Sequence, residues 1–344
     1  MKYKLIVLGI TVLFGSNILF AENLGGFSNS EFRYGSNARE FALAGALVAE
    51  SNLGFRQFSN PALLALIESS EVGLSLFNMS LDRSIQTFTY SRHLPPKAGA
   101  GISIYRIGVD NIIGRNTIGE ITESYNNSDI MGILTFGVQF NKKLAIGLNM
   151  KILYSNTRVK DFLEKNIGSN GVGIDLGILY QVNNKLNIGL RIQNIINKSK
   201  WKYSLYKDLS VIEESYSINS PKIFTAGAKY NILEKLLFLL QVDVSLIAII
   251  KNTSGNYELG IVRSENDKIL WRIPEDGYII RVGIEKEFEN DFILRAGLHQ
   301  ADPVIGFGFK ISVWKDYNII WDYAVDPGMN REGISHNFSW RIEI

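Results

Sequence analysis

Apolar and polar residues alternate along most of this chain. The segment Leu236–Ile250, LLFLLQVDVSLIAII, shows this clearly, because Gln241, Asp243 and Ser245 occupy every second position of an otherwise apolar run. A period of two residues is typical of a β-strand with one apolar and one polar face. The segment is therefore predicted as a strand and not as a membrane-spanning helix, which needs about 20 consecutive apolar residues.

The same alternation recurs as pairs of strands joined by a tight turn. In each pair, about ten alternating residues lead into a short group of Asn, Asp, Lys or Glu, and a second alternating run follows, as in a β-hairpin. The predicted hairpins lie at residues 134–152, 176–195, 224–244, 280–298 and 306–325. The chain from residue 69 to 344 is therefore predicted to be one all-β domain.

The ends of these hairpins differ from each other. An aromatic residue stands just before nearly every tight turn, namely Tyr90, Phe140, Tyr180, Tyr230, Phe288 and Trp314. The connections between hairpins are long and polar, and loops are expected at residues 110–127, 156–169, 198–219 and 251–276. Short turns at one end, long loops at the other and aromatic residues at one level indicate a transmembrane β-barrel. A soluble β-sandwich or barrel is the alternative.

The strand count supports a closed barrel. About fourteen strands can be placed between residues 70 and 344, and bacterial barrels have an even number of strands. We therefore predict a transmembrane antiparallel β-barrel whose first and last strands both meet the end with the short turns. Closure pairs every backbone polar group, as hydrocarbon surroundings require.

Alternation also assigns charged residues to the interior of the barrel, since a charge facing lipid near the midplane costs about 2–4 kcal/mol. The predicted lumen-lining residues are Asp175, Arg191, Asp243, Arg281, Glu285, Arg295, His299 and Asp322. One interpretation is that they form a selective path for a substrate. The other is that they pair across a narrow barrel and simply fill it.

Composition excludes several function classes. The chain has 344 residues and a formal net charge of +2, so no basic excess favours nucleic acid. It has no cysteine, and its three histidines lack metal-ligand spacing, so neither a metal nor a cofactor is expected. The sequence contains neither a nucleophile elbow nor a phosphate-binding glycine loop, and an enzyme is not expected.

Residues 1–21 are predicted to be a signal peptide. Lys2 and Lys4 precede the apolar run Leu5–Phe20, and Ala21 provides a small residue for cleavage. A transmembrane anchor is the alternative, but the apolar run is short and contains glycine and asparagine. We therefore expect export to the bacterial outer membrane.

Residues 22–68 precede the first predicted strand and differ from the rest. They contain the small-residue run ALAGALVA at residues 42–49 and the elbow Asn60–Pro61–Ala62. Proline fixes φ and can begin a helical turn there. A compact segment of this kind would fit inside the barrel as a plug, and an extension lying across the mouth of the barrel is the alternative.

These residues also resemble a known family. The pattern of the PorV/PorQ group, within the superfamily of the FadL long-chain fatty-acid transporters, is similar to Ala38–Arg39, Ala42–Ala46, Val48–Ala49 and Asn60–Pro61–Ala62. The C-terminal stretches Trp321–Ala324 and Ser335–Ser339 resemble the same group. The resemblance spans the chain after the signal peptide.

The resemblance implies two different activities. FadL-like proteins pass hydrophobic molecules inward, with an N-terminal hatch in the lumen and a kinked third strand that opens the wall sideways. On this interpretation, Gly99 and Gly101 mark a lateral gate, and the plug or gate residues are Arg39, Gly45, Asn60, Pro61 and Ala62. PorV-like proteins instead act as barrel partners in type IX protein secretion.

Three functions are therefore open. The main prediction is an outer-membrane transporter of fatty-acid-like hydrophobic molecules. The alternatives are an interaction barrel for secreted protein cargo and a structural or surface barrel with a sealed lumen. In each case the partners are outer-membrane lipids and the cargo, with no nucleic acid, and the barrel is expected to be a monomer.

Overall fold

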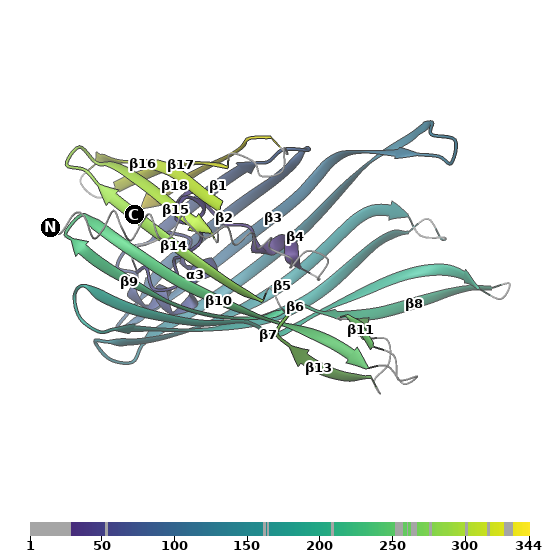
Figure 1. Cartoon of the computed structure of the whole chain (residues 1–344), viewed down its shortest axis with the longest axis horizontal. Helices are drawn as coiled ribbons and strands as arrows, with labels where there is room; N and C mark the ends of the chain where they lie inside the picture. Colours follow the sequence, from purple (N-terminus) through teal and green to yellow (C-terminus); the bar gives the residue numbers. More distant parts are fainter. Residues whose placement is uncertain are drawn as a thin grey trace, which may run out of the picture.

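A computed structural model describes residues 29–51, 54–160, 163, 165–207, 210–251, 257–259, 261–262, 267–274, 277–299, 302–314, 317–326 and 333–344. Within these ranges the chain forms a closed antiparallel β-barrel of 14 strands, seen from the side in Figure 1. The fold class predicted from the alternation is therefore confirmed. The predicted signal peptide, residues 1–21, lies outside the described residues.

Strand segments are numbered along the chain, and 18 are assigned in the described part. The first nine are β1 (Glu71–Asn78), β2 (Arg83–Leu94), β3 (Ala98–Arg115), β4 (Ile121–Gln139), β5 (Leu144–Lys160), β6 (Asn166–Gln181), β7 (Leu186–Lys207), β8 (Ser210–Asn219) and β9 (Lys222–Leu233). The others are β10 (Leu236–Lys251), β11 (Tyr257–Leu259), β12 (Ile261–Val262), β13 (Lys268–Arg272), β14 (Tyr278–Glu287), β15 (Phe292–His299), β16 (Asp302–Trp314), β17 (Tyr317–Asp326) and β18 (Ser335–Glu343).

The 18 segments make up 14 wall strands because some of them occupy the same position in the wall. β8 pairs with residues 198–207 of β7, and β9 pairs with residues 186–193 of β7, so β8 and β9 together form one strand of the wall. β11, β12 and β13 pair with the far ends of β10 and β8. β1 pairs with both β2 and β18, which closes the barrel.

The two ends of the barrel are built differently. Tight turns join β4 to β5, β6 to β7 and β9 to β10 at one end, called the short-turn end below. At the other end, the hairpin end, the β3–β4, β5–β6 and β7–β8 hairpins extend well beyond strands such as β1, β2 and β14–β18 (Figure 1). The loops expected at 110–127, 156–169 and 198–219 are therefore largely strands. Sequence periodicity misses such extensions because polar residues occupy both faces of a strand that stands in water.

The outer face of the wall is apolar. Large side chains such as Leu134, Met150 and Ile152 are exposed, while their chain neighbours Asn149 and Lys151 point inward and are buried. Aromatic residues beside the short turns are also exposed on this outer face, including Phe140, Tyr180, Tyr230 and Phe288. The alternation thus sorts side chains between two faces, as the sequence predicts.

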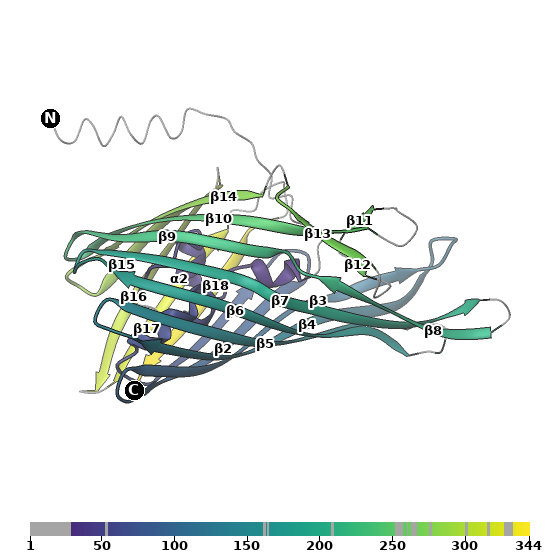
Figure 2. The same cartoon turned by 90° about the horizontal axis from the view of Figure 1, so that it is seen from below.

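The region before β1 forms only short helices, η1 (Ser30–Arg33), α2 (Ala38–Ala42), α3 (Arg56–Ser59) and η2 (Pro61–Leu66). The side chain of Asn37 caps α2 by accepting from the amide of Glu40 at 3.0 Å. In Figures 1 and 2 these purple helical turns lie between opposite walls of the barrel. In the described ranges, no helix has both the length and the apolar character to cross a membrane.

Candidate functional site

Residues 29–51 and 54–67, called the N-terminal segment below, pack against the inner face of the wall through backbone contacts. A Cβ added at Gly99 would stand 2.0 Å from the Leu64 carbonyl oxygen, and one at Gly147 would stand 2.2 Å from the Pro61 carbonyl carbon. Glycine is needed there because any side chain would push the two backbones apart. Backbone atoms of the segment are similarly close at Gly137, Gly189 and Gly297. Side chains of the segment approach Gly177, Gly227 and Gly306, and a Cβ at Gly283 would be less tightly placed, 3.1 Å from the Leu43 carbonyl oxygen.

These glycines are aligned across neighbouring strands. Gly99, Gly137, Gly147 and Gly177 pair directly in one row from β3 to β6. Gly189 pairs with Gly227, and Gly283 pairs with Gly297. The inner wall therefore carries a band without side chains, called the glycine band below, and the N-terminal segment fills it.

The elbow Asn60–Pro61–Ala62 is anchored to this band. The Asn60 side chain donates to the carbonyl oxygens of Val48 at 2.8 Å, Ile178 at 3.1 Å and Leu190 at 3.4 Å. Its own Oδ1 accepts from the Ala62 amide at 3.0 Å and so caps η2, which begins with Pro61. A single buried side chain thus joins two parts of the N-terminal segment to strands β6 and β7.

A buried chain of ion pairs joins the segment to the other side of the barrel. Arg39 of α2 contacts Glu285 through two hydrogen bonds of 2.7 and 2.8 Å, Glu285 also contacts Arg295 at 2.6 Å, and Arg295 contacts Asp322 at 2.7 Å. Burial opposes the charged form of Arg39, but the carboxylates of Glu285, Glu50 and Asp322 together outweigh it and raise the pKa of Arg39 above its ordinary value. The charges alternate, so each buried charge has an opposite neighbour.

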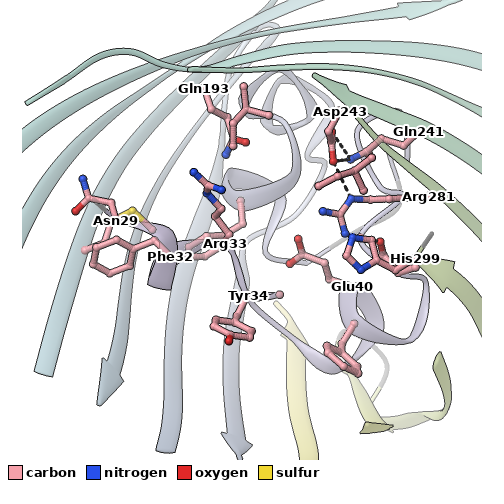
Figure 3. A pocket seen from close by; sticks show the side chains of 18 of the residues that line it. Asn29, Phe32, Arg33, Tyr34, Glu40, Gln193, Gln241, Asp243, Arg281 and His299 are labelled. Atoms are coloured by element: carbon pink, nitrogen blue, oxygen red, sulfur yellow. Dashed lines mark hydrogen bonds and ion pairs between the residues drawn. The ribbon is translucent and has the colours of Figure 1, made fainter. Parts of the chain in front are cut away.

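Above the segment, toward the hairpin end, lies a cavity of about 380 Å³. One side of this cavity is apolar and includes Phe32, Phe41 and Phe58 of the segment with Met131 and Ile133 of β4. Figure 3 shows the other side, where Gln241, Asp243, Arg281 and His299 gather opposite Asn29 and Phe32. A cavity with one apolar and one charged side can hold a molecule that has both characters.

The charged side of the cavity is held by fixed contacts. Arg281 pairs with Asp243 at 2.7 Å, and Asp243 also accepts from Gln241 at 3.0 Å and from Thr225 at 2.7 Å. Gly45 lies beneath Arg281 with a φ of 74°, and a Cβ there would stand 3.3 Å from a guanidinium nitrogen. Gly45 therefore lets the chain turn under the arginine.

The eight predicted lumen residues divide between two places. Asp175, Arg191, Asp243, Arg281 and His299 line the cavity, whereas Glu285, Arg295 and Asp322 lie in the ion-pair chain with Arg39. Lys151, which the alternation also predicts to face the lumen, pairs with Asp175 at 2.7 Å. The sequence prediction omitted the aromatic residues Phe32, Phe41 and Phe58 of the segment, because no strand pattern covers them.

The cavity is closed toward the short-turn end. Along β6, Asp175 lines the cavity, Leu179 belongs to a buried apolar cluster, and Gln181 lines a second hollow of about 320 Å³ at the turns. The cluster joins Leu179 to Leu43, Leu47, Leu63 and Leu239. The N-terminal segment and the wall therefore meet in a buried apolar layer between the two hollows.

Gly99 and Gly101 lie in an intact part of the wall. β3 pairs with β2 and with β4 at both positions, and its register shifts come later, between Val109 and Ile112 and between Ile113 and Arg115. Both glycines face the N-terminal segment and have Leu64 or Gln57 against them. Their role as a lateral gate stays a prediction, and their observed contacts give them a packing role.

Among the described residues, no group of three or more His, Asp or Glu side chains is arranged to hold a metal ion. Two aromatic residues toward the hairpin end are partly covered by neighbours: Tyr203 packs edge-on against Tyr216, and Lys222 lies over the ring of Trp271 at 4.3 Å.

Neither a protein-family model nor a curated protein matches the sequence. Solved structures match the fold. The toluene transporter TodX of P. putida has a TM-score of 0.59 at 14% identity, covering 90% of this chain and 96% of that one. A FadL homologue of Pseudomonas aeruginosa has a TM-score of 0.58 at 11% identity, covering 90% and 98%.

The Ralstonia pickettii toluene transporter TbuX matches with a TM-score of 0.55 at 14% identity, covering 90% of this chain and 97% of that one. The resemblance to the PorV/PorQ group stays a prediction. The chain has the fold of these toluene transporters and of the FadL homologue.

Proposed function

We propose that this protein is an outer-membrane channel for hydrophobic small molecules, with the N-terminal segment as its plug. The observation that carries the proposal is the cavity of about 380 Å³, which has an apolar side and a charged side and ends at the buried apolar layer. A fatty-acid-like molecule fits this division, because its tail can lie on Phe41 and Phe58 while its polar group faces Arg281. The fold shared with toluene transporters supports the same class of cargo.

The proposal places the barrel in a lipid bilayer as a monomer. The exposed apolar side chains form the surface that contacts lipid, and the aromatic residues beside the short turns lie at one interface. Because the wall closes on itself, no strand edge needs a second chain. The predicted signal peptide would direct export, with the short-turn end in the periplasm.

The test fills the cavity and measures uptake. Ile133 is 3% exposed and lines the cavity, whereas its neighbour Leu134 is 50% exposed on the outer face of the same strand. Ile133→Trp should abolish uptake of radiolabelled oleate and toluene by a bacterial host that lacks its own channel for them. Leu134→Trp adds the same ring to the lipid side and should leave uptake unchanged. Equal uptake by the two variants would contradict the proposal.

A protein-binding barrel for secreted cargo is the second candidate. It is favoured by the β3–β4 and β7–β8 hairpins, which extend beyond the wall (Figure 1) and offer exposed surface to a partner. This function does not use the cavity, so Ile133→Trp would leave cargo release unchanged. A structural barrel with a sealed lumen predicts that even the wild-type protein gives no uptake above empty-vector cells.

A further inference from the structure

The wall loses its regular pairing at one place, in the middle of β7. Toward β6, Ile174 pairs with Ile196 and Leu176 pairs with Ile192, so three residues of β7 face the single residue Asp175. On its other side β7 changes partner, from Ile223 of β9 opposite Gln193 to Asn219 of β8 opposite Lys198. Asn194 and Ile195 therefore have no ladder partner on either neighbouring strand.

Side chains take over the role of the missing ladder. The Asn194 amide donates to Asp175 Oδ1 at 2.8 Å, and its side chain donates to the Pro221 carbonyl oxygen at 2.9 Å. Pro221 itself has no N–H to offer. Asn194 is also in the left-handed region, with a φ of 58°. Side-chain contacts can rearrange without unpairing a strand, so this place is easier to open than a continuous ladder.

This interruption separates the cavity from the lipid-facing surface. Gln193, Asn194, Asn197 and Ile223 all line the cavity. On the outer face the same stretch is bordered by the exposed apolar side chains of Leu190, Ile196 and Phe224. A molecule that passed between Asn194 and Pro221 would therefore move from the cavity directly to an apolar surface.

Asn29, at the start of the N-terminal segment, closes the interruption from inside. Its side-chain nitrogen donates to Asn197 Oδ1 at 3.2 Å, to Ser199 Oγ at 3.3 Å and to Ser220 Oγ. Asn29 thus bridges β7 to Ser220, which lies between β8 and β9, across the gap in strand pairing. Figure 3 shows Asn29 on the cavity wall beside Phe32, remote from the Asp243–Arg281 side.

We propose that the interruption between β7 and β8–β9 is the lateral portal through which the hydrophobic molecule leaves the cavity for the membrane, and that Asn29 is its latch. The inference rests on the proposed function and specifies its route. It places the opening in β7, whereas the sequence resemblance implies the third strand. The N-terminal segment below the cavity stays in place during passage.

Disulfides can test this route, because the chain has no cysteine of its own. Asn29→Cys with Ser220→Cys would lock the latch. Leu43→Cys with Gly283→Cys would lock the segment to the wall, where an added Cβ at Gly283 stands 3.3 Å from the Leu43 Cβ, near the ~3.5–4.5 Å of a disulfide. Uptake of radiolabelled oleate is measured in cells before and after reduction, with the single-cysteine variants as controls.

The oxidised Asn29/Ser220 variant should take up oleate at the rate of empty-vector cells and recover on reduction. The oxidised Leu43/Gly283 variant should match wild type, since only the Asn29 end of the segment moves and the part around Leu43 stays in place. Asn29→Ala should raise uptake about three- to tenfold, as expected from losing hydrogen bonds of ordinary net strength. Undiminished uptake with the latch oxidised overturns the portal, and so does loss of uptake with only the Leu43/Gly283 disulfide formed.

A second measurement does not depend on transport. A phospholipid with a diazirine at the end of one acyl chain is photolysed in membranes that contain the Asn29/Ser220 variant, and adducts are mapped by mass spectrometry. Adducts on the cavity-lining residues Gln193 and Ile223 should form in the reduced protein and disappear on oxidation. Equal labelling in both states overturns the portal. Wild-type uptake equal to that of empty-vector cells would instead refute the proposed function. In that case the labelling result alone would decide whether the portal opens.

Discussion

The glycine band makes a sharp prediction about Gly147. An alanine Cβ at this position would stand 2.2 Å from the Pro61 carbonyl carbon and 2.4 Å from the Ala62 amide nitrogen, both of them backbone atoms. Restoring an ordinary contact, which begins at 3.4 Å, requires a displacement of roughly 1.2 Å. Such a movement would strain the hydrogen bonds that Asn60 makes with Ile178 and Leu190.

The cost can be estimated from its parts. Overpacking of a close-packed interior typically costs about 1–3 kcal/mol, and weakening buried hydrogen bonds adds about 1 kcal/mol. Gly147→Ala should therefore weaken attachment of the N-terminal segment by about 2–4 kcal/mol. Hydrogen exchange at the Ala62 and Leu63 amides should accelerate by about 30- to 1,000-fold if exchange follows detachment.

Gly132→Ala is the matched control. Gly132 lies on β4, and a Cβ built there has no atom within 4 Å. The same added methyl group should leave exchange of the segment amides unchanged and slightly stabilise the barrel, by about 0.4–1 kcal/mol, because alanine restricts the unfolded chain. Equal segment protection in the two variants would refute the claim that the glycines exist to seat the segment.

Two further changes test the anchors of the segment. Glu285→Gln should lower barrel stability by about 3–5 kcal/mol, because it leaves buried Arg39 without its carboxylate. The loss is measured as a lower temperature at which the gel mobility of the barrel changes. The control, Glu213→Gln in the exposed pair with Lys165, should cost under about 1 kcal/mol. A smaller loss at Glu285 would count against the ion-pair chain as an anchor. Asn60→Asp keeps the cap of η2 but loses the three donated hydrogen bonds, so limited proteolysis should release the segment faster than in wild type, and Asn60→Ala should release it faster still. An unchanged cleavage rate for Asn60→Asp would show that those donors do not hold the segment.

Strand positions and side-chain faces could be predicted because they follow from local alternation. Asp175, Asp243 and Arg295 are buried inside as predicted, since a one-residue error in register would have moved each to the outer face. The strand count was predictable for the same reason. The extensions of β3, β4, β7 and β8 were not, because polar residues on both faces hide the period.

The site could be predicted only in part. Inward charges were found by alternation, but their division into an ion-pair chain and a cavity depends on where Arg39 and Gly45 of the N-terminal segment meet the wall. Asn29 and Asn194 carried no signal, since each acts through contacts between residues far apart in the chain. Long-range register shifts such as that opposite Asp175 leave no periodic trace in a single sequence.

The glycine band also has a consequence for how the molecule is assembled. The N-terminal segment lies against strands from β3 through β16, so wall and segment share one contact surface around most of the barrel. We expect the wall to close most readily around a segment already in place, because each strand then meets its contact as it joins. A chain synthesised without the segment should therefore fold more slowly and into a less uniform barrel.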